Sequence, residues 1–166
     1  MTFSVPFERL EEGAAFKTRG RTVTEADVVG FSALTGDWHP QHADAEWAAS
    51  SAFGQRIAHG MLVLSFALGL IPLDPERVVA LRRVRDVVFR RPVRLGDTIH
   101  VEGKIAGLKA VGEDADAGLV TLALDVVRQD GLRACAAKIE ALWRCGESGA
   151  DGEPAGPCGE MVWGGA

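Results

Sequence analysis

The sequence predicts an α+β protein in which an antiparallel sheet wraps around one central apolar helix. Residues 60–71 are apolar on every side of the helix that they would form, and a helix without a polar face has to be surrounded by protein. Residues 78–143 contain several strand-like segments separated by turn signals, which is the pattern of an antiparallel meander. The chain has 166 residues, 47% of them hydrophobic, which suffices for a single domain with a buried core.

Before the central helix, the sequence predicts a short strand and an amphipathic helix. Residues 14–23 are typical of a short strand that leads into a turn. Residues 25–34 follow Thr24, which is expected to be the N-cap of a helix, with Asp27 returning the capping bond. The expected apolar face of this helix consists of Ala26, Val29, Ala33 and Leu34, with Val28 and Phe31 beside it.

The segment after this helix carries turn and capping residues. Gly36 can adopt the positive φ that suits the C-terminus of a helix. Pro40 opposes helix formation and pushes His39 toward an extended conformation, so we expect residues 37–42 to form an irregular loop. Asp44 is expected to cap a short helix that follows.

The C-terminal half has the alternation of strands, and a tail of different composition follows it. Residues 129–131, Gln-Asp-Gly, are a hairpin signal because glycine tolerates positive φ, and residues 107–118 predict a longer polar loop. We expect residues 1–145 to form the domain and the Gly- and Pro-rich residues 146–166 to be a flexible tail. The expected strands are residues 78–90, 98–105, 119–128 and 132–143.

Charge and composition argue against several classes of protein. The formal net charge of -5 argues against a nucleic-acid-binding protein, which needs a basic surface. Residues 60–71, the longest apolar run, are too short to cross a bilayer, and residues 1–13 lack the apolar run of a signal peptide. Three cysteines without a Cys-x-x-Cys pair indicate reduced thiols and a cytoplasmic location, rather than a disulfide framework or a zinc ribbon.

Three short segments carry the most specific pattern in the chain. Residues 31–42 read Phe-Ser-Ala-Leu-Thr-Gly-Asp-Trp-His-Pro-Gln-His, residues 53–61 read Phe-Gly-Gln-Arg-Ile-Ala-His-Gly-Met, and residues 89–97 read Phe-Arg-Arg-Pro-Val-Arg-Leu-Gly-Asp. In order and spacing, they resemble the hydratase motif, the His-Gly-Met segment and the strand-entry segment of the MaoC-like, (R)-specific enoyl-CoA hydratases. The resemblance covers roughly residues 7–143. It implies a hotdog fold, which agrees with the predicted sheet around a helix.

The resemblance implies that Asp37 and His42 are catalytic residues that act on one water molecule. Adding water across an α,β-unsaturated thioester needs a base for the water and an acid for the α-carbon, and a carboxylate and an imidazole can divide these roles. The sequence leaves open which residue takes which role. His39 stands where the family motif has a supporting Asn, so the polar network and the substrate preference are expected to depend on it.

The head of the central helix is where the resemblance places the thioester carbonyl. Gly60 stands at the expected start of this helix, where free backbone N–H groups and the helix dipole favour the negative charge of an enolate oxygen. His59 and His39 are further candidates for substrate binding. For His59, the alternative is a structural role in the turn before the helix.

A basic stretch in this acidic protein is a candidate phosphate-binding region. Coenzyme A and the phosphopantetheine of a carrier protein both carry phosphate, which arginine recognises well. The alternative is an arginine-rich strand face in contact with water. The candidates are Arg82, Arg83, Arg85, Arg90 and Arg91, with Arg94 at the end of the stretch.

The prediction is therefore a hydro-lyase that needs no metal or redox cofactor. Its substrate would be a 2-enoyl thioester of coenzyme A or of an acyl carrier protein, hydrated reversibly to an (R)-3-hydroxyacyl thioester. A homodimer is expected, because pairing of protomers covers the edge that a short wrapped sheet leaves exposed. The acyl chain and the physiological direction are left open.

Three alternatives remain at this point. The first is a hotdog thioesterase, which would release a free thiol. The second is a non-catalytic subunit that binds acyl thioesters without turning them over. The third is a metal site, since carboxylates and imidazoles at close spacing can bind zinc or iron. Its ligands would come from Asp37, His39, His42 and Asp44.

Overall fold

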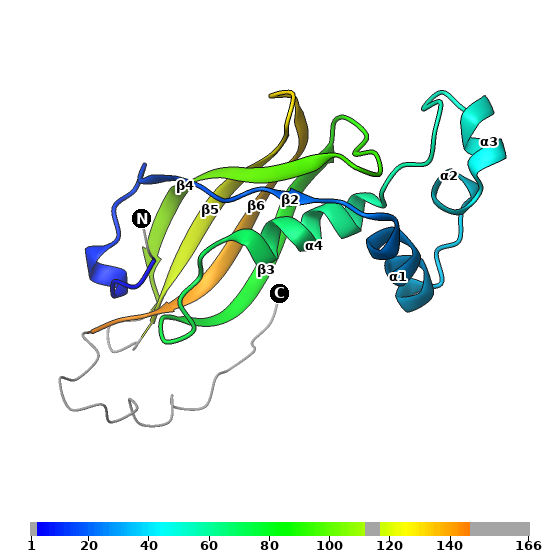
Figure 1. Ribbon diagram of the computed structural model, residues 1–166. Helices are drawn as coiled ribbons and strands as arrows, with labels where there is room; N and C mark the ends of the chain where they lie inside the picture. Colours follow the sequence, from blue (N-terminus) through cyan, green and yellow to red (C-terminus); the bar gives the residue numbers. More distant parts are fainter. Residues whose placement is uncertain (1–2, 112–116, 147–166) are drawn as a thin grey trace.

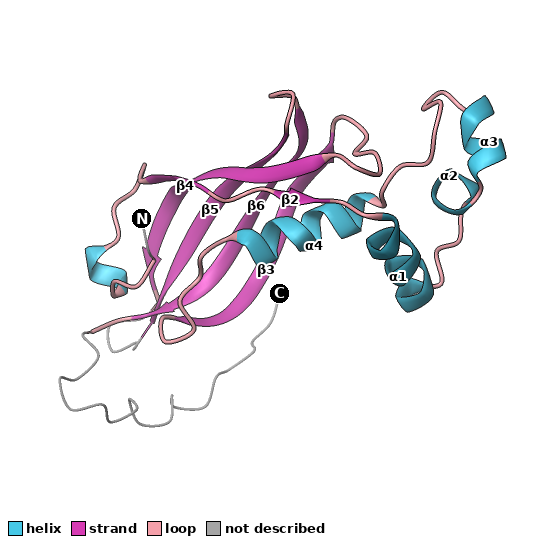
Figure 2. Cartoon of the chain, in the orientation of Figure 1, coloured by secondary structure: helices cyan, strands magenta, loops and turns pink. Residues whose placement is uncertain are grey.

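The structure is a computed structural model that describes residues 3–111 and 117–146. One antiparallel sheet curls around helix α4, and the short helices α1, α2 and α3 lie beyond the head of α4 (Figures 1 and 2). This is the α+β hotdog arrangement that the sequence predicts. The helical elements are η1 (Phe7–Arg9), α1 (Glu25–Thr35), α2 (Pro40–Ala43), α3 (Ala45–Ser50) and α4 (Gly60–Leu70). The strands are β1 (Ala15–Lys17), β2 (Arg21–Thr22), β3 (Val78–Phe89), β4 (Thr98–Ala110), β5 (Ala117–Arg128) and β6 (Arg133–Arg144).

The order of the strands differs from a simple meander. The order is β1-β4-β5-β6-β3, with β2 also paired to β4, so β3 lies beside β6 at the far edge rather than beside β4. The segment between β3 and β4 connects two strands that are not neighbours in the sheet, and on its way it pairs with the segment before α4. Ala58 donates its backbone N–H to the Val93 carbonyl, and Ile57 forms a bridge with Arg94. The crossing segment therefore forms one wall beside the head of α4.

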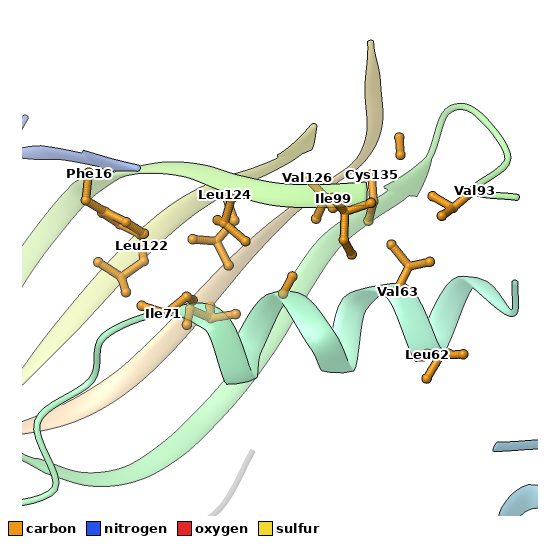
Figure 3. Packing of buried hydrophobic residues seen from close by; sticks show 14 of the residues in the cluster. Phe16, Leu62, Val63, Ile71, Val93, Ile99, Leu122, Leu124, Val126 and Cys135 are labelled. Carbon is orange, nitrogen blue, oxygen red and sulfur yellow. The ribbon is translucent and has the colours of Figure 1, made fainter. Parts of the chain in front are cut away.

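The core lies between α4 and the concave face of the sheet (Figure 3). Val63 and Ala67 of α4 are buried together with strand residues such as Ile99 and Val126, while Leu62, which is also buried, points to the other side of α4 (Figure 3). Burial of side chains of this size is worth about 1.5–3 kcal/mol each, which makes this contact the main stabilising layer. The sheet does not enclose the helix completely. A stripe on the other side of α4 is exposed, formed by Met61, Ser65 and Gly69, so the expectation of a helix surrounded by protein fails on one side of the single chain.

Local capping signals place the ends of α1 and α3 as predicted. Thr24 and Asp27 form the reciprocal capping box of α1, and Gly36 ends this helix with a φ of 78°. Asp44 caps α3 by accepting a hydrogen bond from the backbone N–H of Trp47. These are interactions within four residues, so the sequence alone defines them.

Two expectations about this region are wrong. Residues 37–42 are not a loop throughout, because Pro40 begins α2 at the first helical position, where its missing N–H costs nothing. The expected apolar face of α1 is also exposed, with Leu34 at 82% and Val29 at 43%, while the structure buries Val28 and Ser32. The reason is tertiary: α1 lies beyond the end of the sheet and does not pack along it (Figure 1).

Strand β3 is an exposed and irregular edge. Its pairing with β6 is interrupted by register shifts, one of them between Arg85 and Val88, and Asp86 in this interval has a φ of 54°. Bulges of this kind are common at sheet edges and bend the strand. Exposed apolar side chains line the strand: Leu81, Val84, Val88 and Phe89.

The predicted flexible tail at residues 146–166 lies outside the described residues, except for Gly146. The predicted hairpin loop at 107–118 is shorter than expected, because β4 continues to Ala110 and β5 begins at Ala117. Of the cysteines in the described ranges, Cys135 is buried and Cys145 is half-buried. No helix within those ranges has the length and apolar character needed to span a membrane.

Candidate active site

Asp37, His42 and His59 meet at the head of α4. Asp37 lies in the turn after α1, His42 lies in α2, and His59 is the residue before α4. One oxygen or nitrogen atom from each of the three side chains lies within 4.8 Å of the others. This separation leaves room for one water molecule to bind a carboxylate oxygen and an imidazole nitrogen together. The fold thus places the side chains of the predicted pair, Asp37 and His42, on either side of a space that one water molecule could occupy.

The backbone around it fixes the orientation of His42. The side chain is 4% exposed, and its Nδ1 lies 2.7 Å from the Ile57 carbonyl oxygen. A carbonyl only accepts, so Nδ1 carries the hydrogen, and in the neutral ring Nε2 is the basic atom. The side-chain nitrogen of Gln41 lies 2.9 Å from this Nε2. In the neutral tautomer Nε2 is therefore a proton acceptor, and in this structure it accepts from the side-chain N–H of Gln41.

Burial lowers the pKa of His42 below its usual value. The bond to the Ile57 carbonyl opposes this change, and the carboxylate of Asp37 also raises the pKa, whereas charge on His59 or His39 lowers it. The net lowering keeps the imidazole neutral over more of the pH range. A neutral imidazole is the form that can remove a proton from water.

Asp37 is more open than His42. Its side chain is 52% exposed. One carboxylate oxygen accepts a hydrogen bond from the backbone N–H of His39 at 3.2 Å, and its backbone carbonyl lies 3.1 Å from Nε2 of His59. The carboxylate thus has free acceptor capacity toward the cavity, while the backbone N–H of this residue donates to the hydroxyl of Thr35 at 3.3 Å and its carbonyl contacts His59.

A cavity of about 570 Å³ opens beside this cluster. It runs along the head of α4 and under the end of β3, and its walls are mainly apolar. The volume suits an acyl chain or a similar small apolar group. Its lining includes Phe31, Thr35, Asp37, Gln41, His42, Phe53, Ile57, His59, Gly60, Met61, Val63, Phe89, Arg90, Arg91 and Cys135.

Gly60 is the first residue of α4 and lies on the cavity wall, as predicted. Within the described residues no acceptor is recorded for its backbone N–H, as expected at the first turn of a helix. A Cβ at this position would lie 2.9 Å from the ring of Phe89. The close approach of Phe89 explains why the position needs glycine: a side chain would push the ring out of place.

His39 and His59, both expected to bind substrate, have other contacts. His39 accepts a hydrogen bond from the backbone N–H of Gln41 through Nδ1, so it is the N-cap of α2, and its ring packs edge-on against Trp47. An Asn at this position would cap the helix in the same way. His39 is not among the residues that line the cavity. His59 lines the cavity but directs Nε2 to Asp37 and Ser32.

The arginine stretch separates into three groups. Arg83 and Arg85 lie near the carboxylate of Glu140 on β6, at 3.7 and 2.8 Å, and face away from α4. Arg90 and Arg91 are exposed and lie at the edge of the cavity. Arg82 and Arg94 are also exposed but do not line the cavity. The structure brings only two of the predicted arginines to the site.

The geometry argues against a shared metal ion in this cluster. The predicted alternative used His39 and Asp44, whereas the group that the described residues bring together is Asp37, His42 and His59. The rings of His42 and His59 are stacked, with centroids 3.7 Å apart and planes 24° apart. Imidazole binds a metal along a line in its own plane, and two nearly parallel rings do not point such lines at one ion. Stacking therefore favours proton chemistry at His42.

Sequence reasoning missed Gln41 and Phe89 as site residues. Gln41 fills the spacer position of the hydratase motif, so its position beside His42 gave only a weak signal. Phe89 was assigned to a strand, and nothing in the local sequence shows that the strand ends over Gly60. Long-range packing decides both contacts.

A family model and several known proteins match most of the described chain. Residues 9–127 match the family model described as MaoC like domain. Protein MaoC from Klebsiella aerogenes is 41% identical over 96 residues, which are 57% of this chain and 29% of that protein. The match thus spans less than a third of the length of that relative.

Two solved structures match over most of their length. A monoamine oxidase regulatory protein from Archaeoglobus fulgius is 38% identical, with a TM-score of 0.80 and coverage of 86% of this chain and 96% of that one. The R-hydratase PhaJ1 from Pseudomonas aeruginosa is 30% identical, with a TM-score of 0.68 and coverage of 87% and 88%. With the family model matching well over half of its length, the chain belongs to the family described as MaoC like domain.

Proposed function

We propose that the protein catalyses the reversible hydration of a 2-enoyl thioester to an (R)-3-hydroxyacyl thioester, with Asp37 and His42 acting on one water molecule. The observation that carries the proposal is the approach of the two side chains to within 4.8 Å beside an apolar cavity. The similarity to a structure named R-hydratase supports the same reaction and stereochemistry.

The hydration step uses the tautomer of His42 that the structure favours. Water replaces the Gln41 amide at Nε2, which takes a proton from this water while the water oxygen forms a bond to the β-carbon of the substrate. The electron pair of the double bond moves to the thioester oxygen, where the backbone N–H of Gly60 stabilises the negative charge. The carboxylate of Asp37 holds the water and stabilises the imidazolium. Nε2 then returns its proton to the α-carbon, and dehydration follows the same steps in reverse.

The test is a panel of enoyl thioesters of varied length and branching. Hydration removes the conjugated double bond, so the absorbance of the enoyl thioester is expected to fall on addition of the protein. A thiol reagent in a parallel assay detects a thioesterase, because only hydrolysis releases free coenzyme A. Binding without either signal would favour the non-catalytic subunit, and the hydratase proposal would then fail.

The carrier end of the substrate is expected to pass over Arg90 and Arg91. Replacing both by Ala should raise the KM for coenzyme A thioesters by about 10-fold or more, because each lost charge-assisted hydrogen bond costs about 1.5–3 kcal/mol. Pantetheine thioesters that lack the distal phosphates should be unaffected. The matched control is the double change of Arg83 and Arg85 to Ala, since these residues lie on the other face with Glu140.

Steady-state kinetics on both substrate types decides the matter. If the change of Arg90 and Arg91 raises KM equally for both substrates, these residues act on the acyl end and the phosphate role is wrong. If the control pair raises KM as well, the effect comes from general surface charge.

We expect the protein to form a homodimer that covers strand β3. An exposed apolar edge strand is otherwise a site of uncontrolled association, and Phe89 joins this edge to the cavity. Light scattering at micromolar concentration should give twice the chain mass of 17.6 kDa. Changing Leu81 and Val84 to Asp should produce monomers, whereas Leu34→Asp, an exposed apolar residue on α1, should not. A monomeric wild-type protein would contradict the expectation.

A further inference from the structure

The imidazole of His59 lies between the two residues that are proposed to act on water. It is 3% exposed, although it is a polar ring at the edge of a cavity. Its Nε2 lies 3.1 Å from the backbone carbonyl of Asp37 and 3.2 Å from the hydroxyl of Ser32. One contact of the ring is the stacked ring of His42, with centroids 3.7 Å apart, and another is Phe31, at 5.0 Å.

These contacts define the tautomer of His59. The carbonyl of Asp37 only accepts, so Nε2 carries the hydrogen that is donated to it. In the neutral ring, Nδ1 then keeps a lone pair, and Nδ1 is buried without a hydrogen-bond partner among the described residues. His59 therefore donates from Nε2 to the carbonyl of Asp37 and supports His42 with its ring.

We infer that His59 is a positioning residue, which sets the separation of Asp37 from His42 by holding the backbone of the one and stacking against the ring of the other. This inference rests on the proposed function. Three elements meet on the ring: α1 through Ser32, the turn at Asp37, and α2 through His42. His59 does not need to touch the substrate, in contrast to the binding role expected from the sequence.

The other hydrogen bonds of Asp37 among the described residues are local, to the hydroxyl of Thr35 and from the N–H of His39, so loss of the long-range contact with His59 should matter. The carboxylate of Asp37 is half-exposed, and the hydrogen bond recorded for it comes from the adjacent turn, at the N–H of His39. His42, in contrast, is held by Ile57 independently of His59. Removing the donor on His59 should therefore release Asp37 while His42 keeps its bond to the backbone.

Two replacements separate the donor from the ring. His59→Phe keeps an aromatic ring against His42 and removes the hydrogen bond to Asp37, so kcat should fall by about 10²-fold, the cost of a displacement of about 1 Å at a reacting group. KM should change little. His59→Gln places an amide N–H near the position of Nε2 and loses the ring, so kcat should recover to within about 10-fold of wild type.

The titration of His42 gives a second measurement that needs no substrate. The groups that act on its charge are Asp37 from the turn, His39 at the start of α2 and His59 before α4. Charge on His59 lowers the pKa of His42, so both replacements should raise it. NMR of protein labelled with ¹³C at histidine measures this directly, and the acid limb of kcat/KM should move to higher pH in the same variants.

His100→Phe is the matched control, because His100 lies on β4 beside Glu102, away from the site. It should leave kcat and the titration of His42 unchanged. A kcat equal to that of wild type in His59→Phe overturns the inference. Equal losses of kcat in both His59 variants, with an unchanged pKa of His42, also overturn it, because a purely structural residue would give this result. If His59→Phe does not fold, His59→Gln decides by the same titration. If wild type shows no hydration, the proposed function fails, and the titration still tests the coupling of His59 to His42.

Discussion

Asp37→Asn is expected to lower the turnover of an enoyl thioester by about 10²–10⁴-fold, the usual contribution of a general acid–base residue. The change keeps the shape of the side chain and the oxygen that accepts from His39, but it removes the negative charge that holds the water and stabilises the imidazolium. The side chain is half-exposed, so the protein should remain folded. Steady-state hydration kinetics and a thermal melt on the same preparation give both quantities.

Removing the imidazole of His42 should lower turnover by a similar factor, but the variants differ in their effect on stability. His42 is buried, and His42→Ala leaves the Ile57 carbonyl without its donor, at a cost of about 1–3 kcal/mol in the free energy of unfolding. His42→Asn places an amide N–H near the position of Nδ1 and removes Nε2. Turnover should fall equally in both variants, whereas the melting temperature should fall further in His42→Ala.

The double variant of Asp37 and His42 tests whether the residues act together. Its turnover should be little lower than that of the poorer single variant, because residues that act on one water are not additive. His39→Asn is the control, because Asn keeps the cap on α2. Turnover should change far less in this variant, and a change, if there is one, should be in substrate preference. Substantial turnover in a folded Asp37→Asn protein would falsify the proposed mechanism.

Loss of the backbone N–H of Gly60 should reduce turnover by about 10²–10³-fold, the cost of removing one donor to a developing oxyanion. Gly60→Pro removes this N–H, and proline is tolerated at the first position of a helix. His59, with a ψ of 137°, already has the extended geometry that a following proline requires.

Gly60→Ala is the matched control for this change. Both variants add a Cβ that contacts the ring of Phe89, but only Gly60→Pro lacks the donor. The ratio of the two turnover numbers therefore measures the contribution of the backbone N–H to catalysis, because the steric effect of the Cβ is common to both variants. Equal turnover in the two variants would show that the oxygen of the intermediate lies elsewhere. Phe89→Leu combined with Gly60→Ala should recover activity that the clash alone removes.

Features that depend on neighbours in the chain were predictable from the sequence. Thr24, Asp27 and Gly36 define the ends of α1 because capping involves residues within four positions. The apolar segment that begins at Gly60 forms the central helix, and the alternating segments after it form the sheet. The hydratase motif pointed to Asp37 and His42 as candidates. The motif depends on the spacing of residues in the sequence, so it could be read although the segment between them forms a turn and a helix and not the expected loop.

Contacts between distant segments were decided by the tertiary structure. His42 stacks on His59, which is 17 positions away in the sequence. Phe89 lies over Gly60, which is 29 positions away. Pairing of β3 with β6 leaves β3 at the edge and separates Arg90 from Arg85. Short-range patterns specify helices, strands and caps because those interactions are local, whereas strand order and side-chain stacking depend on how the whole core packs. The sequence by itself thus determined the fold class and the candidate pair Asp37 and His42, and only the packed chain decided which residues surround that pair.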